Sequence, residues 1–408
     1  MRWTRLTTGP LLATGLASLV TLTAHALLLG SLPTPDAGLF ALSMALVETL
    51  SLFGALGQVT LITRLYARQQ HDSFDWLRDL ARLSLLSTAP IGLGVLLLHV
   101  FYPLTPPQLM LVAAATVLTI PVNLSATMLN ARLHHTWGAL LMRLPNSLLI
   151  LPAGMALVRS NFNQLDLVLI SYTLGAAAVL GLSLLLLARH LPRGSVRISL
   201  RQNLEGMIFV VASGSQVLLD QGLLALAGAF LHPTALATFA AIAILLRPFR
   251  LVTGILTMVF SPRFIRHDRE SYAQPIIGVT TLAIIAAVGA ALLTPTIADL
   301  IYEGRYASGY GLIPWLAFAG CLLVVRSVPI SHLSGRAPTG YINRVVLTES
   351  AIVSVVAATS LLVISKLGVL GLVLGLVIGH LTRTVSTFVF WRRFRQIDPH
   401  KGQPVSVT

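Results

Sequence analysis

Charged side chains stand inside long apolar stretches of this sequence, at Glu48, Asp220, Arg247, Arg250, Arg326 and Arg383. An ionised group in hydrocarbon is costly, so such side chains face a helix-bundle interior or a water-filled path through a membrane. They commonly mark the route of a polar solute. These six residues are therefore the first candidates for binding a cargo and moving it across a membrane.

The four arginines favour an anionic cargo, because a guanidinium group binds phosphate oxygens through two parallel hydrogen bonds. Arg247 and Arg250 are three residues apart and therefore share one helix face. We expect Arg247, Arg250, Arg326 and Arg383 to bind a phosphorylated or otherwise anionic substrate. The alternative for Arg250, Arg326 and Arg383 is that their long side chains reach the cytoplasmic membrane surface.

The acidic candidates are Glu48 and Asp220, which we expect to act in transport or ion coupling. A shift of 199 residues places Glu48 on Arg247, so one hypothesis pairs these two across the halves of the chain. The alternative is that each is satisfied within its own half. Asp220 is an arginine partner, an ion ligand or a structural residue. We expect Glu349 to lie at the membrane interface, and His25 to be a hydrogen-bonded packing residue.

The sequence shows no motif for metal binding, enzymatic catalysis or nucleotide binding. No Cys/His cluster has metal-ligand spacing, and no nucleophile with a base or phosphate-binding loop is recognisable, so we expect no enzyme, no metal and no cofactor. The single cysteine, Cys321, excludes an intramolecular disulfide. No sizeable soluble domain is present to hydrolyse ATP. Any coupling is therefore expected to use H⁺, Na⁺ or the membrane potential.

The composition is that of a membrane protein. Hydrophobic residues make up 55% of the chain, charged residues 10%, and the mean hydropathy is +0.82. Soluble domains average about 25% charged residues. The net charge of +14 suggests nucleic-acid binding at first. The charges, however, cluster in short segments between apolar stretches, as membrane topology requires, so no nucleic-acid partner is expected.

About twelve apolar stretches are long enough to cross a hydrocarbon core of about 30 Å. We predict spans at 10–31, 37–62, 82–102, 109–130, 139–158, 165–188, 204–230, 234–260, 275–301, 311–331, 345–365 and 369–390. The first is expected to be an uncleaved span rather than a signal peptide, because a second span follows at once. Short connectors such as Tyr102–Pro107 and Lys366–Gly368 carry the Pro and Gly that end helices.

The basic residues predict the orientation. With the N-terminus inside, 21 Lys and Arg residues lie on the inner side, three on the outer side and four within spans. Such a bias places both termini in the cytoplasm and requires an even number of spans. Two six-helix bundles follow, at 1–190 and 203–395, joined by a cytoplasmic linker at 191–202 and followed by a cytoplasmic tail at 396–408. The 199-residue similarity suggests a parallel repeat.

Several loose motifs resemble one transporter family. Span two begins with Ala37-Gly38-Leu39-Phe40 and ends with Leu56-Gly57-Gln58-Val59-Thr60-Leu61-Ile62-Thr63-Arg64. Later come Leu219-Asp220-Gln221-Gly222, Phe260-Ser261-Pro262-Arg263 and Tyr302-Glu303-Gly304-Arg305-Tyr306. Over nearly the whole chain this is similar to the polysaccharide-biosynthesis flippases of the multidrug/oligosaccharidyl-lipid/polysaccharide (MOP) exporter superfamily.

The resemblance implies an all-α, MATE-like polytopic membrane protein with alternating access. It implies export of a polyprenyl-pyrophosphate-linked saccharide across a bacterial inner membrane, for O-antigen, capsule or exopolysaccharide synthesis. The implied partners are the lipid-linked oligosaccharide, membrane lipids, a coupling H⁺ or Na⁺, and polysaccharide polymerase machinery. The family varies in its cavity charges, so it assigns neither Glu48 nor Arg247; Asp220 is the best-matched site residue.

Two other functions remain open. An ion-coupled multidrug or organic-cation antiporter of the same superfamily should offer net carboxylate in its cavity, whereas here arginines outnumber acids inside the spans. A membrane-bound sugar polymerase or ligase typically needs a large periplasmic loop, and every outer connector here is short. The sequence therefore favours the flippase.

Overall fold

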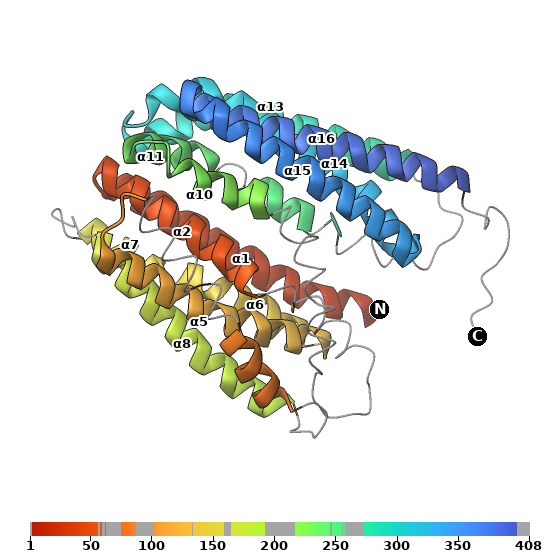
Figure 1. The fold of residues 1–408 in the computed structure, drawn as a ribbon, viewed down its shortest axis with the longest axis horizontal. Coiled ribbons are helices and arrows are strands. Elements are labelled where there is room, and N and C mark those ends of the chain that lie inside the picture. Colours follow the sequence, from red (N-terminus) through yellow and green to blue (C-terminus); the bar gives the residue numbers. More distant parts are fainter. Residues whose placement is uncertain are drawn as a thin grey trace. The chain divides into compact units, whose positions relative to one another are not determined.

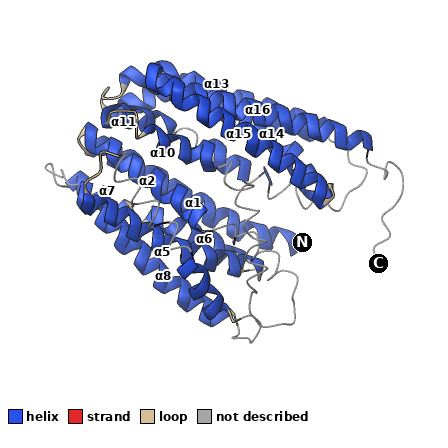
Figure 2. Cartoon of the chain, in the orientation of Figure 1, coloured by secondary structure: helices blue, strands red, loops and turns tan. Residues whose placement is uncertain are grey.

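The protein folds as an all-α polytopic membrane protein. The computed structural model describes residues 2–55, 58, 62, 75–86, 91, 102–132, 134–158, 165–191, 217–244, 247–254, 256–257 and 273–397. Within these residues the regular elements are helices and no strand occurs (Figure 2). Eight described helices are long and apolar enough to cross a membrane, or nine if one bent pair counts as a span. The predicted count of twelve and the cytoplasmic termini stay predictions.

Two compact units make up the chain, Met1–Ala241 (unit 1) and Ile242–Thr408 (unit 2). The linker predicted at 191–202 lies outside the described residues except for Leu191. The predicted division into 1–190 and 203–395 therefore stays a prediction.

Unit 1 is a bundle of helices (Figure 1). Its elements are α1 (Arg2–Ser31), α2 (Thr34–Gly54), a helix at 76–86, α5 (Pro106–Ala131), α6 (His135–Ser147), α7 (Ile150–Val158), α8 (Leu165–His190), the π-helix η1 (Leu218–Gly222), α10 (Leu223–Ala227) and most of α11 (Pro233–Ala243), whose last two residues belong to unit 2. Helix α5 packs against α2, α6 and α8, and α1 packs against α6 and α7.

Local sequence explains where these helices begin and end. At α5 the side chain of Thr105 caps the helix, while Gln108 accepts a hydrogen bond from the Thr105 backbone, and prolines occupy the first helical positions. The span predicted at 139–158 corresponds to one candidate membrane span, His135–Ala156, in which the turn residues Leu148 and Leu149 separate α6 from α7. Pro145 lies inside the last turn of α6, where it removes a backbone donor.

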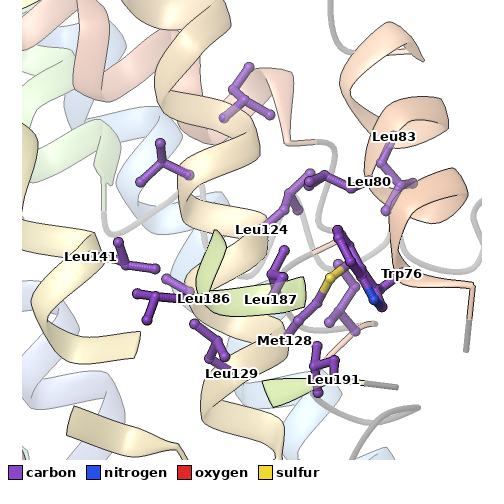
Figure 3. Close-up of a cluster of buried hydrophobic side chains, with 14 of the residues drawn as sticks. Trp76, Leu80, Leu83, Leu124, Met128, Leu129, Leu141, Leu186, Leu187 and Leu191 are labelled. Carbon is purple, nitrogen blue, oxygen red and sulfur yellow. The ribbon is translucent and has the colours of Figure 1, made fainter. Parts of the chain in front are cut away.

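The apolar core of unit 1 joins four helices. Figure 3 shows Trp76 beside Met128 of α5, with Leu187 of α8 and Leu141 of α6 in the same cluster. Polar bonds supplement this packing: the Ser147 hydroxyl of α6 donates to the backbone oxygen of Ala17 in α1 over 3.0 Å. Helices in lipid gain little from apolar contact alone, so such bonds help to hold them together.

Helix α2 also packs closely against η1 and α10 within unit 1. A methyl group added at Gly38 would lie 1.8 Å from the backbone oxygen of Pro233, and one at Gly228 would lie 2.5 Å from a methyl group of Leu42. In real structures a Cβ atom essentially never lies this close to a backbone oxygen. Glycine at position 38 is therefore a requirement of this packing.

Unit 2 contains α13 (Ala273–Tyr302), the 3₁₀ turn η2 (Ala307–Leu312), α14 (Ile313–Arg336), α15 (Thr339–Leu367) and α16 (Val369–Ile397). Helix α14 packs against α13 and α16, and α15 packs against α16 (Figure 1). Gly368 turns the chain between α15 and α16 at φ +59°, in the left-handed region that favours glycine. Cys321 is a free, buried cysteine in the core of unit 2 with Phe249 and Val324.

The predicted spans of unit 2 match the observed helices closely. The spans at 275–301, 345–365 and 369–390 fall within α13, α15 and α16, and the span at 311–331 corresponds to α14. The predicted turn at Lys366–Gly368 is also confirmed. Strong apolar patterning bounded by Pro and Gly is thus enough to locate these helices.

Candidate functional site

Arg326 forms a buried ion pair with Glu349 inside unit 2. Its Nη2 atom lies 2.5 Å from Oε2 of Glu349, and the two side chains are 12% and 5% exposed. The Arg326 Nε group donates to the Thr387 hydroxyl over 2.8 Å, and that hydroxyl donates to Oε1 of Glu349 over 2.5 Å. Both oxygens of the carboxylate are therefore satisfied, as a buried charge requires.

Arg383 approaches the same carboxylate from α16. Its Nε atom lies 3.7 Å from Oε2 of Glu349, and its side chain is only 4% exposed. Thr387 follows Arg383 by four residues, so the two share one face of α16. The structure thus brings two of the four predicted arginines together around one acid. Two guanidinium groups and one carboxylate leave one net positive charge.

Arg326 and Glu349 lie at the same distance from the turn between their two helices. Arg326 is ten residues before the end of α14, and Glu349 is ten residues after the start of α15. At a rise of 1.5 Å per residue, both lie about 15 Å from the turn that joins the two helices. Both helices pack against α16, which brings Arg326 and Glu349 together beside Arg383 and Thr387. Arg326, for which reach to the cytoplasmic surface was the alternative, is ion-paired inside the bundle.

Sequence reasoning missed the partner of these arginines. Glu349 was expected at the membrane interface, yet it is 4% exposed and ion-paired within the bundle. The signal that points to it is the mirrored spacing of Arg326 and Glu349 about the turn at Ala337 and Pro338. His25, in contrast, matches its prediction: it is buried, and its Nδ1 atom lies 2.9 Å from the backbone oxygen of Thr21.

The remaining two arginines begin a separate helical segment. Helix α11 ends at Ala243, and the helix Arg247–Gly254 starts at Arg247 with Pro248 next to it. Proline suits a first helical turn because its missing N–H has no partner there. Arg247 and Arg250 are half-buried, and Arg247 interacts electrostatically with the hydroxyl group of buried Tyr302. This interaction lies within unit 2.

Glu48 lines a cavity of about 340 Å³ in unit 1. The residues around it are Val47, Glu48, Ser51, Ala55, Thr119, Asn123, Met142, Arg143, Pro145, Asn146, Tyr172 and Val217. Glu48, Ser51 and Ala55 follow helical spacing on α2 and so present one face of it. Thr119 and Asn123 do the same on α5. Sequence reasoning named Glu48 and missed the amides and hydroxyls that surround it.

Glu48 lies near other polar side chains of unit 1. Its carboxylate lies near the hydroxyl group of Tyr172, and Thr119 is also a neighbour of that hydroxyl group. Tyr172 is buried, whereas Glu48 is half-buried. Glu48 and Arg247 belong to different units, and their predicted pairing stays a prediction. Each has an interaction in its own unit.

Asp220 lies in η1, where the backbone widens from an α-helix to a π-helix at Leu218–Gly222. The placement of its side chain lies outside what the structure describes. Single-turn π-helices occur frequently at functional sites. Val217, the residue before η1, lines the Glu48 cavity. The π-helix therefore contains Asp220, the site residue that best matches the transporter family named above. It directly follows Val217, which lines the Glu48 cavity.

Comparison with known proteins relates the fold to one group of transporters. No family model matches the chain, and no curated protein matches it by sequence. Among solved structures, the lipid II flippase MurJ in an inward closed conformation aligns with a TM-score of 0.67 and 13% identity, covering 93% of this chain and 86% of that one.

Two drug transporters are similar as well. An inward-facing multidrug resistance MATE family transporter of the MOP superfamily has a TM-score of 0.61 and 15% identity, covering 92% of this chain and 94% of that one. The MATE multidrug transporter DinF-BH has a TM-score of 0.62 and 14% identity, covering 96% of this chain and 95% of that one. At such identities the likeness shows a common fold. This chain has the fold of MOP-superfamily transporters.

Proposed function

We propose that this protein is a flippase that carries a polyprenyl-pyrophosphate-linked saccharide across a bacterial inner membrane by alternating access. The cargo would serve synthesis of O-antigen, capsule or exopolysaccharide. The fold shared with a lipid II flippase and with MATE transporters supports a transporter of this kind. The cargo class is argued from the charges of unit 2.

The observation that carries the proposal is the positive charge within unit 2. Within the described part of this unit, Arg326 and Arg383 lie with one glutamate, Glu349, in the bundle interior. The carboxylate neutralises one of the two charges contributed by Arg326 and Arg383. Arg247 and Arg250 add two more on a separate helix. A cationic bundle interior stabilises an anion, and pyrophosphate matches the fork of guanidinium donors.

The four arginines then divide into two roles. Arg326 and Arg383 hold Glu349 and set the potential inside the bundle. Arg247 and Arg250 supply the direct contacts to the pyrophosphate. Glu48 and Asp220 remain the candidates for coupling transport to H⁺ or Na⁺, and polymerase machinery remains the proposed partner downstream.

The test combines a gene deletion with arginine variants. Deletion should leave lipid-linked saccharide on the cytoplasmic leaflet and remove polysaccharide from the cell surface. Arg247→Ala should fail to restore display at normal membrane abundance, whereas Arg344→Ala should restore it, because Arg344 is exposed near the start of α15. Normal display with Arg247→Ala would remove Arg247 from the cargo site, and no accumulation after deletion would overturn the function.

A second candidate is an ion-coupled antiporter for organic cations. The Glu48 cavity favours it, because a half-buried carboxylate can balance a cationic drug. The similarity to the drug transporter DinF-BH favours it too. The exposed guanidinium group of Arg143 on the same cavity argues against net negative charge there. Sensitivity of the deletion strain to cationic dyes, with no saccharide accumulation, would select the antiporter.

A further inference from the structure

The Glu48 cavity is lined by several polar side chains that can form hydrogen bonds. Four helices of unit 1 contribute them: Glu48 and Ser51 from α2, Thr119 and Asn123 from α5, Asn146 from α6 and Tyr172 from α8. Amide and hydroxyl side chains each combine donor and acceptor capacity. A site built from four helices is also held in place by bundle packing.

These groups lie deep in the bilayer. Thr119 is 13 residues from the start of α5, and Asn146 is 11 residues from the start of α6. Those separations correspond to about 20 Å and about 16 Å along antiparallel helices, which is close to the middle of the hydrocarbon core. Polar side chains at this depth are expensive and are usually retained for a solute.

One of the hydroxyl groups is left unsatisfied. The oxygen of Ser51 is buried, and among the described residues it has no hydrogen-bond partner. Ser51 is only 4% exposed and lines the cavity. Buried polar atoms nearly always have a partner, so an orphaned one beside a cavity points to a ligand or water that supplies it.

The cavity has no net charge. Its carboxylate is Glu48 and its guanidinium group is that of Arg143. A pyrophosphate would need an excess of cations, and an organic cation an excess of anions. Apolar walls complete the lining at Met142, Pro145 and Val217. Hydroxyl-binding groups beside small apolar surfaces fit a sugar ring, which has polar edges and C–H faces.

The volume limits what fits. Ligand cavities run from about 300 to 1,000 Å³. At about 340 Å³ this cavity suits one ring rather than an oligosaccharide or a prenyl chain. We propose that it is a subsite for one uncharged sugar residue of the cargo, with Asn123, Asn146 and Tyr172 as the main hydrogen-bonding groups. The inference builds on the proposed function, because it assigns the saccharide part of the same cargo to unit 1.

The first test measures binding to the full-length protein in nanodiscs. The probes are methyl glycosides of glucose, galactose, mannose and N-acetylglucosamine, detected by saturation-transfer NMR. At least one should bind, and Asn123→Ala and Asn146→Ala should each weaken it about five-fold, the loss of roughly one hydrogen bond. Asn130→Ala is the matched control, because Asn130 is on α5 outside the cavity lining. Binding that is absent, or unchanged in both cavity variants, overturns the subsite.

A second arm tests the alternative ligand. Tetraphenylphosphonium should bind no more weakly after Glu48→Gln than before. Binding of this cation that disappears with Glu48→Gln would identify a cation site and overturn the sugar assignment.

A third arm ties the subsite to the cargo. In proteoliposomes, Asn123→Ala should raise the KM for polyprenyl pyrophosphate that bears one sugar and leave that for the sugar-free lipid unchanged. An equal change for both lipids would contradict the subsite. The two proposals fail separately: a deletion strain without lipid-linked saccharide accumulation removes the flippase, whereas normal flipping with no effect of Asn123 and Asn146 removes only the subsite.

Discussion

Glu349 is the residue on which the interior of unit 2 depends. Two guanidinium groups and a hydroxyl group converge on its carboxylate, deep between α14, α15 and α16. A buried ion pair adds little over an apolar replacement, because desolvation offsets the attraction. Removing one partner alone is much worse, since it leaves charge buried without compensation.

Glu349→Ala should therefore destabilise the protein by about 3 to 5 kcal/mol. The measurement is thermal unfolding in detergent micelles. Glu303→Gln is the control, because Glu303 is exposed and its change should stay within about 0.5 kcal/mol. Replacing Arg326, Glu349 and Arg383 together by Met, Leu and Met should recover most of the loss, while saccharide transport stays absent. Full stability of Glu349→Ala alone would contradict the ion-pair network.

His134 gives the unit 1 bundle a pH dependence. Burial lowers the pKa of His134 below its usual value, and the neighbouring rings of His190 and His135 lower it further. The His134 and His190 ring centroids are 4.4 Å apart. The folded state therefore binds fewer protons than the unfolded state, so stability falls as the pH drops below about 6.5 and levels off below the folded pKa.

We expect His134→Gln to flatten this dependence. Melting temperatures of the wild type should fall between pH 7 and pH 5, and those of the variant should fall less, because one disfavoured protonation has been removed. His232→Gln serves as the comparison, since His232 lies in the turn before α11. Identical slopes for wild type and His134→Gln would show that His134 does not contribute.

At the scale of elements, the packing of α2 against the start of α11 requires that position 38 carry no side chain. Gly38→Ala would press a methyl group against the Pro233 backbone oxygen, which cannot rotate away as a side chain can. This variant should lower the melting temperature clearly. Gly181→Ala in α8 has nothing within 4 Å of the added methyl group and should be neutral or slightly stabilising, by up to about 1 kcal/mol. Equal melting temperatures would mean that α2 does not pack there.

The sequence was sufficient to locate α13 to α16, because each is a long apolar run bounded by Pro or Gly. It located the span that contains α6 and α7, but not the short turn between them, since Pro145 lies in a run that remains apolar on both sides. It identified the charged residues but not all their contacts. Arg326 and Glu349 lie at equal distances from the turn between α14 and α15, which can be read from the sequence. The cavity of Glu48 requires four helices to converge, and one sequence carries no signal for that.

At the scale of the whole molecule, the distribution of basic residues predicts a membrane topology that can be measured. A fluorescent protein fused after Thr408 should fluoresce in the cytoplasm, and a cysteine replacing Thr105 should react with an impermeant maleimide from outside. The reason is the predicted topology, which puts 21 basic residues inside and three outside. A fusion that does not fluoresce, together with a Thr105→Cys variant that does not react from outside, would show that the orientation is the opposite of the predicted one.

Distances within this protein can be measured with spin labels attached to introduced cysteines. Cys321 is the only cysteine of the chain, and it is buried against apolar neighbours. Cys321→Ala therefore yields a thiol-free background in one step. Spin labels attached at Leu12 of unit 1 and Leu292 of unit 2, which are exposed on their helices, would then report a distribution of distances by electron paramagnetic resonance. Two populations that exchange weight when cargo is added would be the spectroscopic form of alternating access.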